Sequence, residues 1–588
     1  MPDSLFAADF QQLYSHPGPM FPSPEDWRDC PIYFLMVDRF NNPDRPPLHP
    51  PFDDPNCFQY QGGTFNGIRA RLDYIQNLRA KAIWLSPVLK NRVNDQGCYH
   101  GYGIHDFLHA NPNFATNAAA ADDELRALVD AAHQAGLYVI FDIVLNHTGD
   151  MFAYDGFGAQ APYSVNPLPI AWRDVNGAPR ADWPVVEHIP APRPADGLVW
   201  PSELQFNDYF RRQGGMPAPD DDTIGDFASL KQMRTDNPAV QNALIRAYQY
   251  VIARFDVDGF RIDTLRYLKG GLPLTFGNAV REYALSIGKK NFFTFGEVWT
   301  NNAEDTIANF IGRNTGNDDS GDLVGVDAAL DYPLYDALKW TVKGLANPSG
   351  VVAMYLNRKH VEKDIVSSHG DATRYFVTFL DNHDVKERLR HWDPGMQAAL
   401  DDEVTLGIAC LAALPGIPCI YYGTEQGLHG AGSDPAVREA LWGGPGHDPN
   451  SPFYQQIARI LGLRSDQAAL RYGRFYFRQL SGDGASFGFS SFTPGVLAFS
   501  RILNDREIIV VANFSKVSPQ TLFVGVDFTL SNDGTALNIL YSNKPASAPA
   551  EPTRNLPNAR VTQADGSVSQ GICATRVTLA PGEVQILG

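Results

Sequence analysis

The sequence predicts an α/β protein, a (β/α)8 TIM barrel with one inserted segment after the third strand and a C-terminal antiparallel β-sandwich. Two observations predict this fold. Short, nearly continuous apolar runs alternate with helical patterns over the first three quarters of the chain, which is typical of a buried parallel sheet. From about residue 468 the apolar period changes to two, which is typical of antiparallel strands.

The predicted barrel strands are short apolar runs bounded by loops or helix ends. In chain order they cover residues 32–36, 82–86, 137–142, 257–263, 292–297, 325–330, 376–381 and 417–422. Apolar residues at helical spacing precede the second strand over residues 68–78 and the third strand over residues 125–135, where Gly136 is expected to cap the helix.

Two segments depart from this alternation. Prolines and aromatic residues without a clear βα unit predict an inserted domain, and the period-two runs at residues 475–477, 496–502, 508–514 and 521–526 predict the sandwich. The predicted domains are residues 1–145 (N-terminal segment and first part of the barrel), 146–235 (insertion), 236–467 (rest of the barrel) and 468–588 (sandwich).

Net charge and hydropathy indicate which classes of partner, nucleic acid or membrane, are to be expected. The 588 residues include 48 Lys+Arg and 66 Asp+Glu, a net charge of −18, and no basic patch, so nucleic acid is not an expected partner. No membrane association is expected either. The most apolar stretch, residues 405–423, is interrupted by Pro415 and Gly416 and is predicted to form a buried helix followed by a buried strand.

The cysteines and the N-terminus bear on the compartment. The cysteines are scattered without a CxxC motif, which predicts free buried thiols rather than disulfides or a zinc site. They are Cys30, Cys57, Cys98, Cys410, Cys419 and Cys573. The first residues lack the basic and apolar regions of a signal peptide. We expect a cytoplasmic protein, with a processed secreted form left open and no prediction of oligomeric state.

Polar residues gather at the predicted C-terminal ends of four strands, where parallel barrels carry their catalytic groups. They are Asp142, Asn146 and His147 at the third strand, Arg261 and Asp263 at the fourth, Glu297 at the fifth, and Asp381, Asn382, His383 and Asp384 at the seventh. One such acid alone would be an ordinary helix cap or loop charge. Several carboxylates together suit acetal cleavage, in which one stabilises or attacks the cation and another protonates the leaving oxygen.

The spacing of Arg261 and Asp263 adds a chemical detail. Residues two apart on a strand point to the same face, so the guanidinium is expected to hold Asp263 ionised, as a nucleophile requires. An ordinary structural ion pair is the alternative. Neighbouring negative charges and exclusion of water are expected to raise the pKa of Glu297 to roughly 6–7.

Four segments resemble the signature regions of the α-amylase family, glycoside hydrolase family 13. They are residues 142–147 (DIVLNH), 259–263 (GFRID), 296–299 (GEVW) and 382–384 (NHD), in the order and at the spacing typical of that family. Flanking segments at residues 62–63 (GG), 99–103 (YHGYG) and 414–425 (LPGIPCIYYGTE) are also similar. The resemblance covers about residues 30 to 588 and includes the insertion and the C-terminal β domain.

The resemblance implies a role for each matched residue. Asp263 would be the nucleophile, Glu297 the general acid/base, and Asp384 the third carboxylate, which binds sugar hydroxyls. The remaining substrate-binding residues implied at the cleavage point are Tyr102, Asp142, His147, Arg261 and His383, with Tyr102 as a stacking platform. Plain packing at the barrel mouth is the alternative for Tyr102, and a structural role is the alternative for the two histidines.

The sequence also departs from the family pattern. Many members have Lys-His three and four residues after the nucleophile, where this chain has Arg266 and Tyr267, and we expect Arg266 to bind sugar hydroxyls. Asn146 matches a calcium ligand of the family, but Ser229 stands where an aspartate is expected. Lys231 is close, and Asp226 is a substitute under a shifted alignment. We therefore assign no metal ligands and expect no required cofactor, with a structural calcium left open.

Three functions remain in competition. The leading hypothesis is a retaining α-glucoside hydrolase that cleaves α-1,4 bonds in maltooligosaccharides, linear or cyclic. A glucanotransferase would use the same covalent intermediate and pass the sugar to another sugar. A catalytically inactive interaction protein is the third reading, and the presence of all three carboxylates and Arg261 argues against it.

Overall fold

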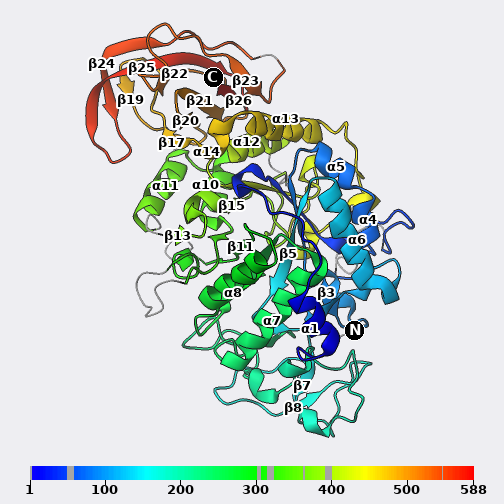
Figure 1. Ribbon diagram of the computed structural model, residues 1–588. Helices are drawn as coiled ribbons and strands as arrows, with labels where there is room; N and C mark the ends of the chain where they lie inside the picture. The colour runs from blue at the N-terminus through cyan, green and yellow to red at the C-terminus, as the bar shows by residue number, and fades with distance from the viewer. Residues whose placement is uncertain are drawn as a thin grey trace.

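The computed structural model describes residues 3–49, 58–300, 306–313, 323–361, 365–390, 400–545 and 547–588 (Figure 1). Its centre is an eight-stranded sheet in which all neighbouring strands run parallel. The strands are β1 (Ile32–Leu35), β2 (Ala82–Leu85), β5 (Tyr138–Val144), β10 (Gly259–Asp263), β11 (Phe293–Gly296), β12 (Ala328–Ala329), β15 (Val377–Thr378) and β16 (Ile417–Tyr421). A parallel bridge from Leu330 to Val377 joins the two ends of the sheet. The predicted barrel is therefore confirmed.

The barrel strands consist largely of apolar residues and are buried on both faces. In β1 and β2 every residue is buried, and the strands pair in register with Phe34 opposite Trp84. The two rings stack at a centroid distance of 3.7 Å. Such near-continuous apolar runs are typical of parallel strands, which have helices on one face and the barrel interior on the other.

Helices surround the sheet (Figure 1). They are α2 (Val37–Phe40), α4 (Phe65–Arg69), α5 (Leu72–Asn77), α6 (Ala121–Gln134), α7 (Pro238–Phe255), α8 (Leu272–Ser286), α10 (Tyr332–Val342), α11 (Ser349–Val361), α12 (Leu400–Ala413), α13 (Pro452–Asp466) and α14 (Ala468–Tyr472). An N-terminal helix, α1 (Ala8–Ser15), packs against α7, where the rings of Phe10 and Tyr250 stack at 4.6 Å. The predicted helix–strand pair of residues 405–423 is present as α12 and β16.

Three sequence expectations need correction. The strand expected at residues 325–330 is limited to Ala328–Ala329, with isolated bridges at Val326 and Leu330. The pattern over residues 68–78 forms two short helices, because Arg71 leaves helical geometry with φ −129° and ψ 19°. The strand expected at residues 376–381 pairs only over Val377–Thr378. Beyond it Asp381 accepts hydrogen bonds from the Thr424 hydroxyl, at 2.7 Å, and from the Leu389 backbone N–H, so side-chain bonds replace the ladder there.

Residues between β5 and α7 form a separate group of short strands at the lower end of the molecule in Figure 1. These are β6 (His147–Thr148), β7 (Phe152–Tyr154), β8 (Ile170–Trp172) and β9 (Lys231–Gln232), with β6 paired to β9 and β7 to β8. The rings of Phe152, Trp172 and Phe210 meet edge to face and form a small core there. A further hairpin, β3 (Leu89–Asn91) with β4 (Ile104–Ala110), follows β2.

The C-terminal region contains two five-stranded sheets whose pairings are mainly antiparallel. One sheet contains β17 (Arg474–Phe477), β20 (Val496–Leu503), β21 (Arg506–Asn513), β26 (Val584–Leu587) and β23 (Ile539–Ser542). The other contains β18 (Leu480–Ser481), β22 (Gln520–Val526), β25 (Val568–Leu579), β24 (Arg554–Thr562) and β19 (Ser486–Phe487). A short hairpin of β13 (Val366–Ser367) and β14 (Gly370–Asp371) lies outside these sheets. The Arg501 guanidinium joins β20 to the barrel by donating to the Ala413 carbonyl at 2.7 Å.

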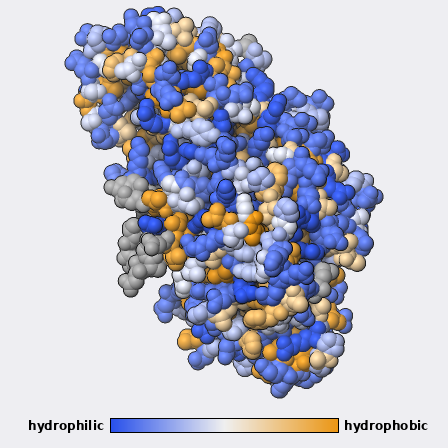
Figure 2. Space-filling model, viewed as in Figure 1, coloured by the Kyte–Doolittle hydropathy of each residue, from blue (hydrophilic) through white to orange (hydrophobic). Residues whose placement is uncertain are grey.

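The surface and the thiols agree with the composition. The face shown in Figure 2 is largely hydrophilic, with apolar residues scattered across it. Cys30, Cys98, Cys410, Cys419 and Cys573 are free and buried, as predicted, and Cys57 lies outside the described residues. Among the helices that the structure describes, none is both long enough and apolar enough to cross a membrane.

Candidate active site

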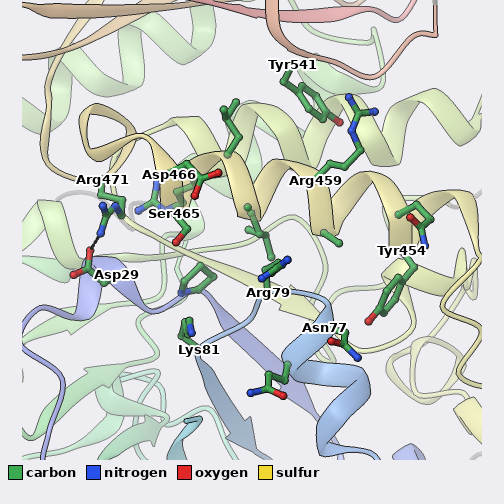
Figure 3. Close-up of a pocket in the computed structure, with 18 of the residues that line it drawn as sticks. Asp29, Asn77, Arg79, Lys81, Tyr454, Arg459, Ser465, Asp466, Arg471 and Tyr541 are labelled. Atoms are coloured by element: carbon green, nitrogen blue, oxygen red, sulfur yellow. Dashed lines mark hydrogen bonds and ion pairs between the residues drawn. The ribbon is translucent and has the colours of Figure 1, made fainter. Parts of the chain in front are cut away.

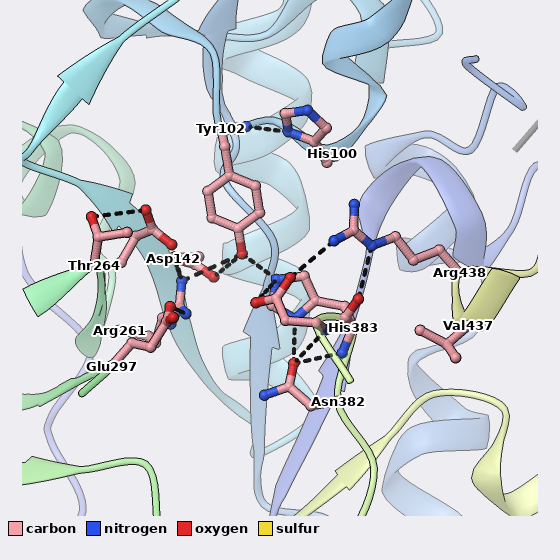
Figure 4. Close-up of polar contacts among 12 residues, drawn as sticks. His100, Tyr102, Asp142, Arg261, Thr264, Glu297, Asn382, His383, Val437 and Arg438 are labelled. Carbon is pink, nitrogen blue, oxygen red and sulfur yellow. Dashed lines mark hydrogen bonds and ion pairs between the residues drawn. The ribbon is translucent and has the colours of Figure 1, made fainter. Parts of the chain in front are cut away.

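The strand register brings the predicted polar residues together at one end of the barrel. Arg261 on β10 pairs with Asp142 on β5, and Glu297 directly follows β11. Arg261 and Asp263 point to the same face, as their spacing predicts, because the Arg261 Nη1 atom lies 2.9 Å from the Asp263 Oδ1 atom. Figure 4 shows Asp142, Arg261 and Glu297 facing one another.

A single buried cation faces three carboxylates at the centre of this cluster. The Arg261 Nη1 atom also donates to Asp142 Oδ1 at 2.8 Å, and its Nη2 atom donates to Glu297 Oε2. The guanidinium is fully buried and lies over the ring of Trp84 at 5.5 Å. One positive charge cannot neutralise three negative charges in a medium of low polarity, so protonation of a carboxyl group is favoured.

The pKa values express this imbalance. Burial raises the pKa of Glu297 to about 8, and the charges of Asp263, Asp384 and Asp142 add to the rise against the opposing effect of Arg261. Burial likewise raises the pKa of Asp142 to about 7. Glu297 is therefore protonated at neutral pH, which is the state that a general acid needs, and its pKa lies above the range expected from the sequence.

Asp263 has a different environment. Arg261 contacts its Oδ1 atom, and the Thr264 hydroxyl donates to its Oδ2 atom at 3.1 Å. Thr264 has the left-handed φ of 48°, which is uncommon for a β-branched residue. Both carboxylate oxygens of Asp263 thus have donors, which suits an anion. Asp263 keeps 6% of its surface exposed.

Tyr102 links the carboxylates to His383. Its hydroxyl donates to Asp142 Oδ2 at 2.9 Å, accepts from the Arg261 Nη1 atom at 3.3 Å and contacts the Nε2 atom of His383. The two rings are stacked at 5.6 Å with an interplanar angle of 12°. Burial lowers the pKa of His383 to about 3, so this imidazole is neutral at neutral pH.

Asp384 is held by an arginine that the sequence reasoning missed. The Arg438 Nη2 atom donates to Asp384 Oδ1 at 2.9 Å, and its Nε atom donates to the His383 carbonyl at 2.9 Å. Burial acts to raise the pKa of Asp384, but the His383 imidazole, which becomes charged only at acid pH, and the permanent charge of Arg438 outweigh it, so the pKa is lowered. Arg438 follows a 3-10 turn (Asp434–Val437), and no local pattern distinguishes it from other loop arginines.

Two predicted residues lie outside this network. His147 is buried, and neither ring nitrogen has a hydrogen-bond partner within the described part of the chain. The Arg266 Nη2 atom instead donates to both carboxylate oxygens of Asp222 in the inserted segment, at 2.7 and 2.8 Å. The predictions that these two residues bind substrate therefore remain predictions.

The position of the family's calcium site has a different set of contacts here. Asn146 Oδ1 accepts a hydrogen bond from Gln232 Nε2 at 3.2 Å, and Asp226 Oδ1 accepts one from the Gln232 backbone at 2.9 Å. The Lys231 ammonium lies 3.5 Å from Asp226 Oδ2. Calcium needs several free oxygen ligands, and these oxygens already have donors, so the residues do not fit a calcium cage.

A large cavity lies elsewhere. It measures about 870 Å³ and is lined by α5, α13 and β23, with Arg79, Arg459 and Tyr541 among its residues (Figure 3). None of the three predicted catalytic carboxylates lines it. The chemical groups and this cavity are thus separate, and the carboxylate cluster is the better candidate for an active site because it combines converging acids with shifted pKa values.

Comparison with known proteins settles the family. The model of the alpha-amylase catalytic domain matches residues 34–450. The chain belongs to the alpha-amylase family. Among its relatives are a beta/alpha-amylase of Paenibacillus polymyxa, 30% identical over 95% of this chain, and an alpha-amylase of Streptomyces lividans, 28% identical over 79%. The alignments cover 38% and 52% of those relatives, so this family member spans about half their length or less.

Solved structures of the family share the fold of this member. An alpha-amylase of Geobacillus thermoleovorans in complex with acarbose has a TM-score of 0.64 at 24% identity. The superposition covers 96% of this chain and 99% of that protein. A cyclomaltodextrin glucanotransferase with a three-domain ABC distribution has a TM-score of 0.66 at 22% identity, with 94% of this chain and 98% of that one covered.

Proposed function

We propose that this alpha-amylase-family protein is a retaining α-glucoside hydrolase that cleaves α-1,4 bonds in maltooligosaccharides or cyclic glucans. The observation that carries the proposal is the contact of one guanidinium, that of Arg261, with both Asp263 and Glu297. This bridge supports the short carboxyl separation, roughly 5–5.5 Å, that is typical of retaining enzymes. The two carboxyl groups also differ as an acid and a nucleophile must, since Glu297 holds a proton at neutral pH and Asp263 has donors on both oxygens.

In the first step Asp263 and Glu297 act on opposite sides of the scissile bond. A carboxylate oxygen of Asp263 forms a bond to the anomeric carbon while the bond from that carbon to the leaving oxygen breaks. The proton of Glu297 moves to the leaving oxygen, which avoids release of an alkoxide. The product of this step is a glycosyl ester of Asp263 and a free sugar end.

In the second step water replaces the leaving sugar. The Glu297 carboxylate accepts a proton from water, whose oxygen attacks the anomeric carbon, and the ester bond to Asp263 breaks. Each step inverts the anomeric carbon, so the overall configuration is retained. Arg261 remains beside both carboxyl groups, where its charge compensates the negative charge as it moves between them.

The surrounding residues are assigned to sugar binding. Asp384 projects with 24% of its side chain exposed and offers carboxylate oxygens to ring hydroxyls, while neutral His383 and Tyr102 offer further polar atoms. Trp299, two residues after Glu297, is 44% exposed and stacks on Tyr332 at 5.1 Å and 5°. A fixed indole face of this kind suits the apolar face of a pyranose on the leaving-group side.

Relatives support the substrate class. The intracellular maltogenic amylase of Bacillus subtilis is 26% identical over 86% of this chain, and the alignment covers 72% of that protein. A cyclomaltodextrinase is among the proteins with a similar fold. We therefore infer α-glucan oligosaccharides as substrates, with no cofactor required, and place the protein in the cytoplasm, which agrees with its free thiols.

The proposal is tested by following the products from maltoheptaose and from β-cyclodextrin, each with and without added glucose as acceptor. Hydrolysis with an α-anomer appearing first by NMR is expected. A first-formed β-anomer would contradict the double displacement. Products longer than the substrate, dominant at low acceptor concentration, would favour the glucanotransferase, and no turnover of either substrate would favour the inactive reading.

A further inference from the structure

The inserted segment contains a buried ammonium group. The side chain of Lys231 on β9 has no exposed surface, and its Nζ atom donates to the Ala159 carbonyl. The same atom lies 3.5 Å from Asp226 Oδ2 and 3.7 Å from Asp150 Oδ1. Three separate stretches of the insertion therefore meet at one positive charge.

Except for Asp150 Oδ1, which faces the ammonium without a hydrogen-bond donor, the carboxylate oxygens around this ammonium already have donors. Asp226 accepts from the Gln232 backbone at 2.9 Å and from the Tyr154 hydroxyl at 2.6 Å. Asp150 is paired with Arg173 at 2.8 Å. The positive charges of Lys231 and Arg173 thus balance the negative charges of Asp226 and Asp150 without any added ion. A divalent cation at this place would be repelled by Lys231.

Aromatic rings complete the site. The Lys231 ammonium lies over the rings of Tyr154 and Phe152 at 4.7 and 5.2 Å, so ring faces close the sides that the oxygens leave open. Burial lowers the pKa of Lys231, and the charges of Asp226 and Asp150 oppose that shift. The oxygens and rings therefore form a site for a compact cation, and the cation in it is the ammonium group of the chain's own lysine.

This cation is directly connected to the barrel mouth. On β9, Lys231 pairs with Thr148, and the next residue, Gln232, pairs with His147 on β6. The Gln232 side chain also donates to Asn146, which follows β5. Fixing Lys231 thus fixes the strand that carries His147 beside the carboxylate cluster.

We propose that the Lys231 ammonium is the permanent internal cation of the inserted segment, and that it performs the structural task of a bound calcium so that the fold around Asn146 needs no divalent ion. Lys231 is a positioning residue in this scheme and does not touch substrate. The proposal concerns folding of residues 146–235 and does not depend on the glucan activity proposed above.

The first test uses the unmodified protein. After dialysis against EDTA, its melting temperature is expected to be unchanged, and addition of CaCl2 to millimolar concentration is expected to leave it unchanged as well. A loss of melting temperature in EDTA that calcium restores, and that disappears in Asp226→Asn, would overturn the proposal. This test needs no variant at Lys231 and therefore stands if such a variant fails to fold.

The second test compares two lysine variants. Lys231→Met keeps most of the side-chain volume but leaves two carboxylates facing each other, so its melting temperature is expected to fall by at least about 5 °C. Lys269→Met removes a partly exposed ion pair with Asp221 and serves as the matched control, with little expected change. Asp226→Asn in the Lys231→Met background is expected to recover part of the loss. Equal melting temperatures for Lys231→Met and Lys269→Met would overturn the proposal.

Discussion

The two ends of strand β10 carry two buried charge clusters of opposite character. At its C-terminal end Arg261 faces three carboxylates, Asp142, Asp263 and Glu297. Just before its N-terminal end, Asp258 belongs to a cluster in which positive and negative groups are matched. The strand is the same and the burial is similar, so the difference lies in the count of charges.

The N-terminal cluster is balanced. The Lys289 ammonium lies 2.7 Å from Asp258 Oδ1 and 2.6 Å from Asp256 Oδ1, and the Arg126 Nη2 atom lies 3.7 Å from Asp256 Oδ2, so two cations face two carboxylates. The His133 imidazole lies 2.8 Å from Asp258 Oδ2. Burial acts to raise the pKa of Asp258, but Lys289 and His133 outweigh it and the pKa is lowered. Every oxygen of Asp258 has a donor, so this cluster stabilises the fold.

The C-terminal cluster is unbalanced, and the proposed chemistry depends on that imbalance. Its surplus of carboxylates raises the pKa of Glu297 to about 8 and that of Asp142 to about 7. Residues at this end of a parallel barrel perform chemistry, while residues at the opposite end contribute to stability. The comparison teaches that uncompensated charge, rather than burial alone, distinguishes the end proposed to be reactive.

The largest expected effect is on Asp263. Asp263→Asn is expected to reduce kcat/KM on maltoheptaose by about 10⁴-fold or more, because no covalent intermediate can form. The matched control is Asp258→Asn, directly before the same strand. It is expected to lower the melting temperature and leave kcat/KM of the folded protein within a few fold, and equal losses of activity in the two variants would remove the distinction between the ends.

Glu297→Gln is expected to reduce activity on maltoheptaose by about 10²–10⁴-fold, because the leaving oxygen then receives no proton. A glucosyl substrate with a good leaving group needs no protonation in the first step, so a rapid first turnover of such a substrate should survive in this variant. Stopped-flow release of the leaving group measures it. Failure of that first turnover, together with normal turnover by Asp263→Asn, would reverse the two roles.

Lys289→Met tests the opposite end. Removing one partner of a buried ion pair leaves uncompensated carboxylates, so the free energy of unfolding is expected to fall by about 3–5 kcal/mol. Urea denaturation measures this loss, and the pH optimum of the remaining activity should not move. A shifted pH optimum would show that the two ends are coupled through the barrel.

The pH dependence of stability gives a separate test of the unbalanced end. The pKa of Glu297 in the folded protein, about 8, lies above its ordinary value of 4.5, so the folded state holds an extra proton between these values and loses stability as pH rises. Glu297→Gln lacks this penalty. Its melting temperature should therefore exceed that of the unmodified protein by more at pH 8 than at pH 5. An equal difference at both values would contradict the raised pKa.

Much of the barrel end was predictable because its positions follow from short-range patterns. Asp142, Arg261 and Glu297 lie at the ends of apolar runs, and parallel register brings such ends together without further information. The antiparallel C-terminal region was predictable for the same reason, from its period of two.

Contacts between distant segments were not predictable. Arg438 reaches Asp384 across 54 residues, and nothing in its local sequence indicates that contact. Arg266 was assigned to substrate from its position after the nucleophile, yet Asp222 of the insertion binds it in this structure. The insertion has no regular period, so which of its charges meets which barrel residue follows only from its three-dimensional path.

The central claim is that Asp263 forms a covalent bond to the sugar. The most direct test treats the protein with a fluorinated α-glucosyl fluoride, which forms the intermediate readily and releases it slowly, and maps the labelled peptide by mass spectrometry. The account predicts one added glycosyl group per chain, on Asp263, and no label in Asp263→Asn. A label on another residue, or turnover without any labelled protein, would contradict it.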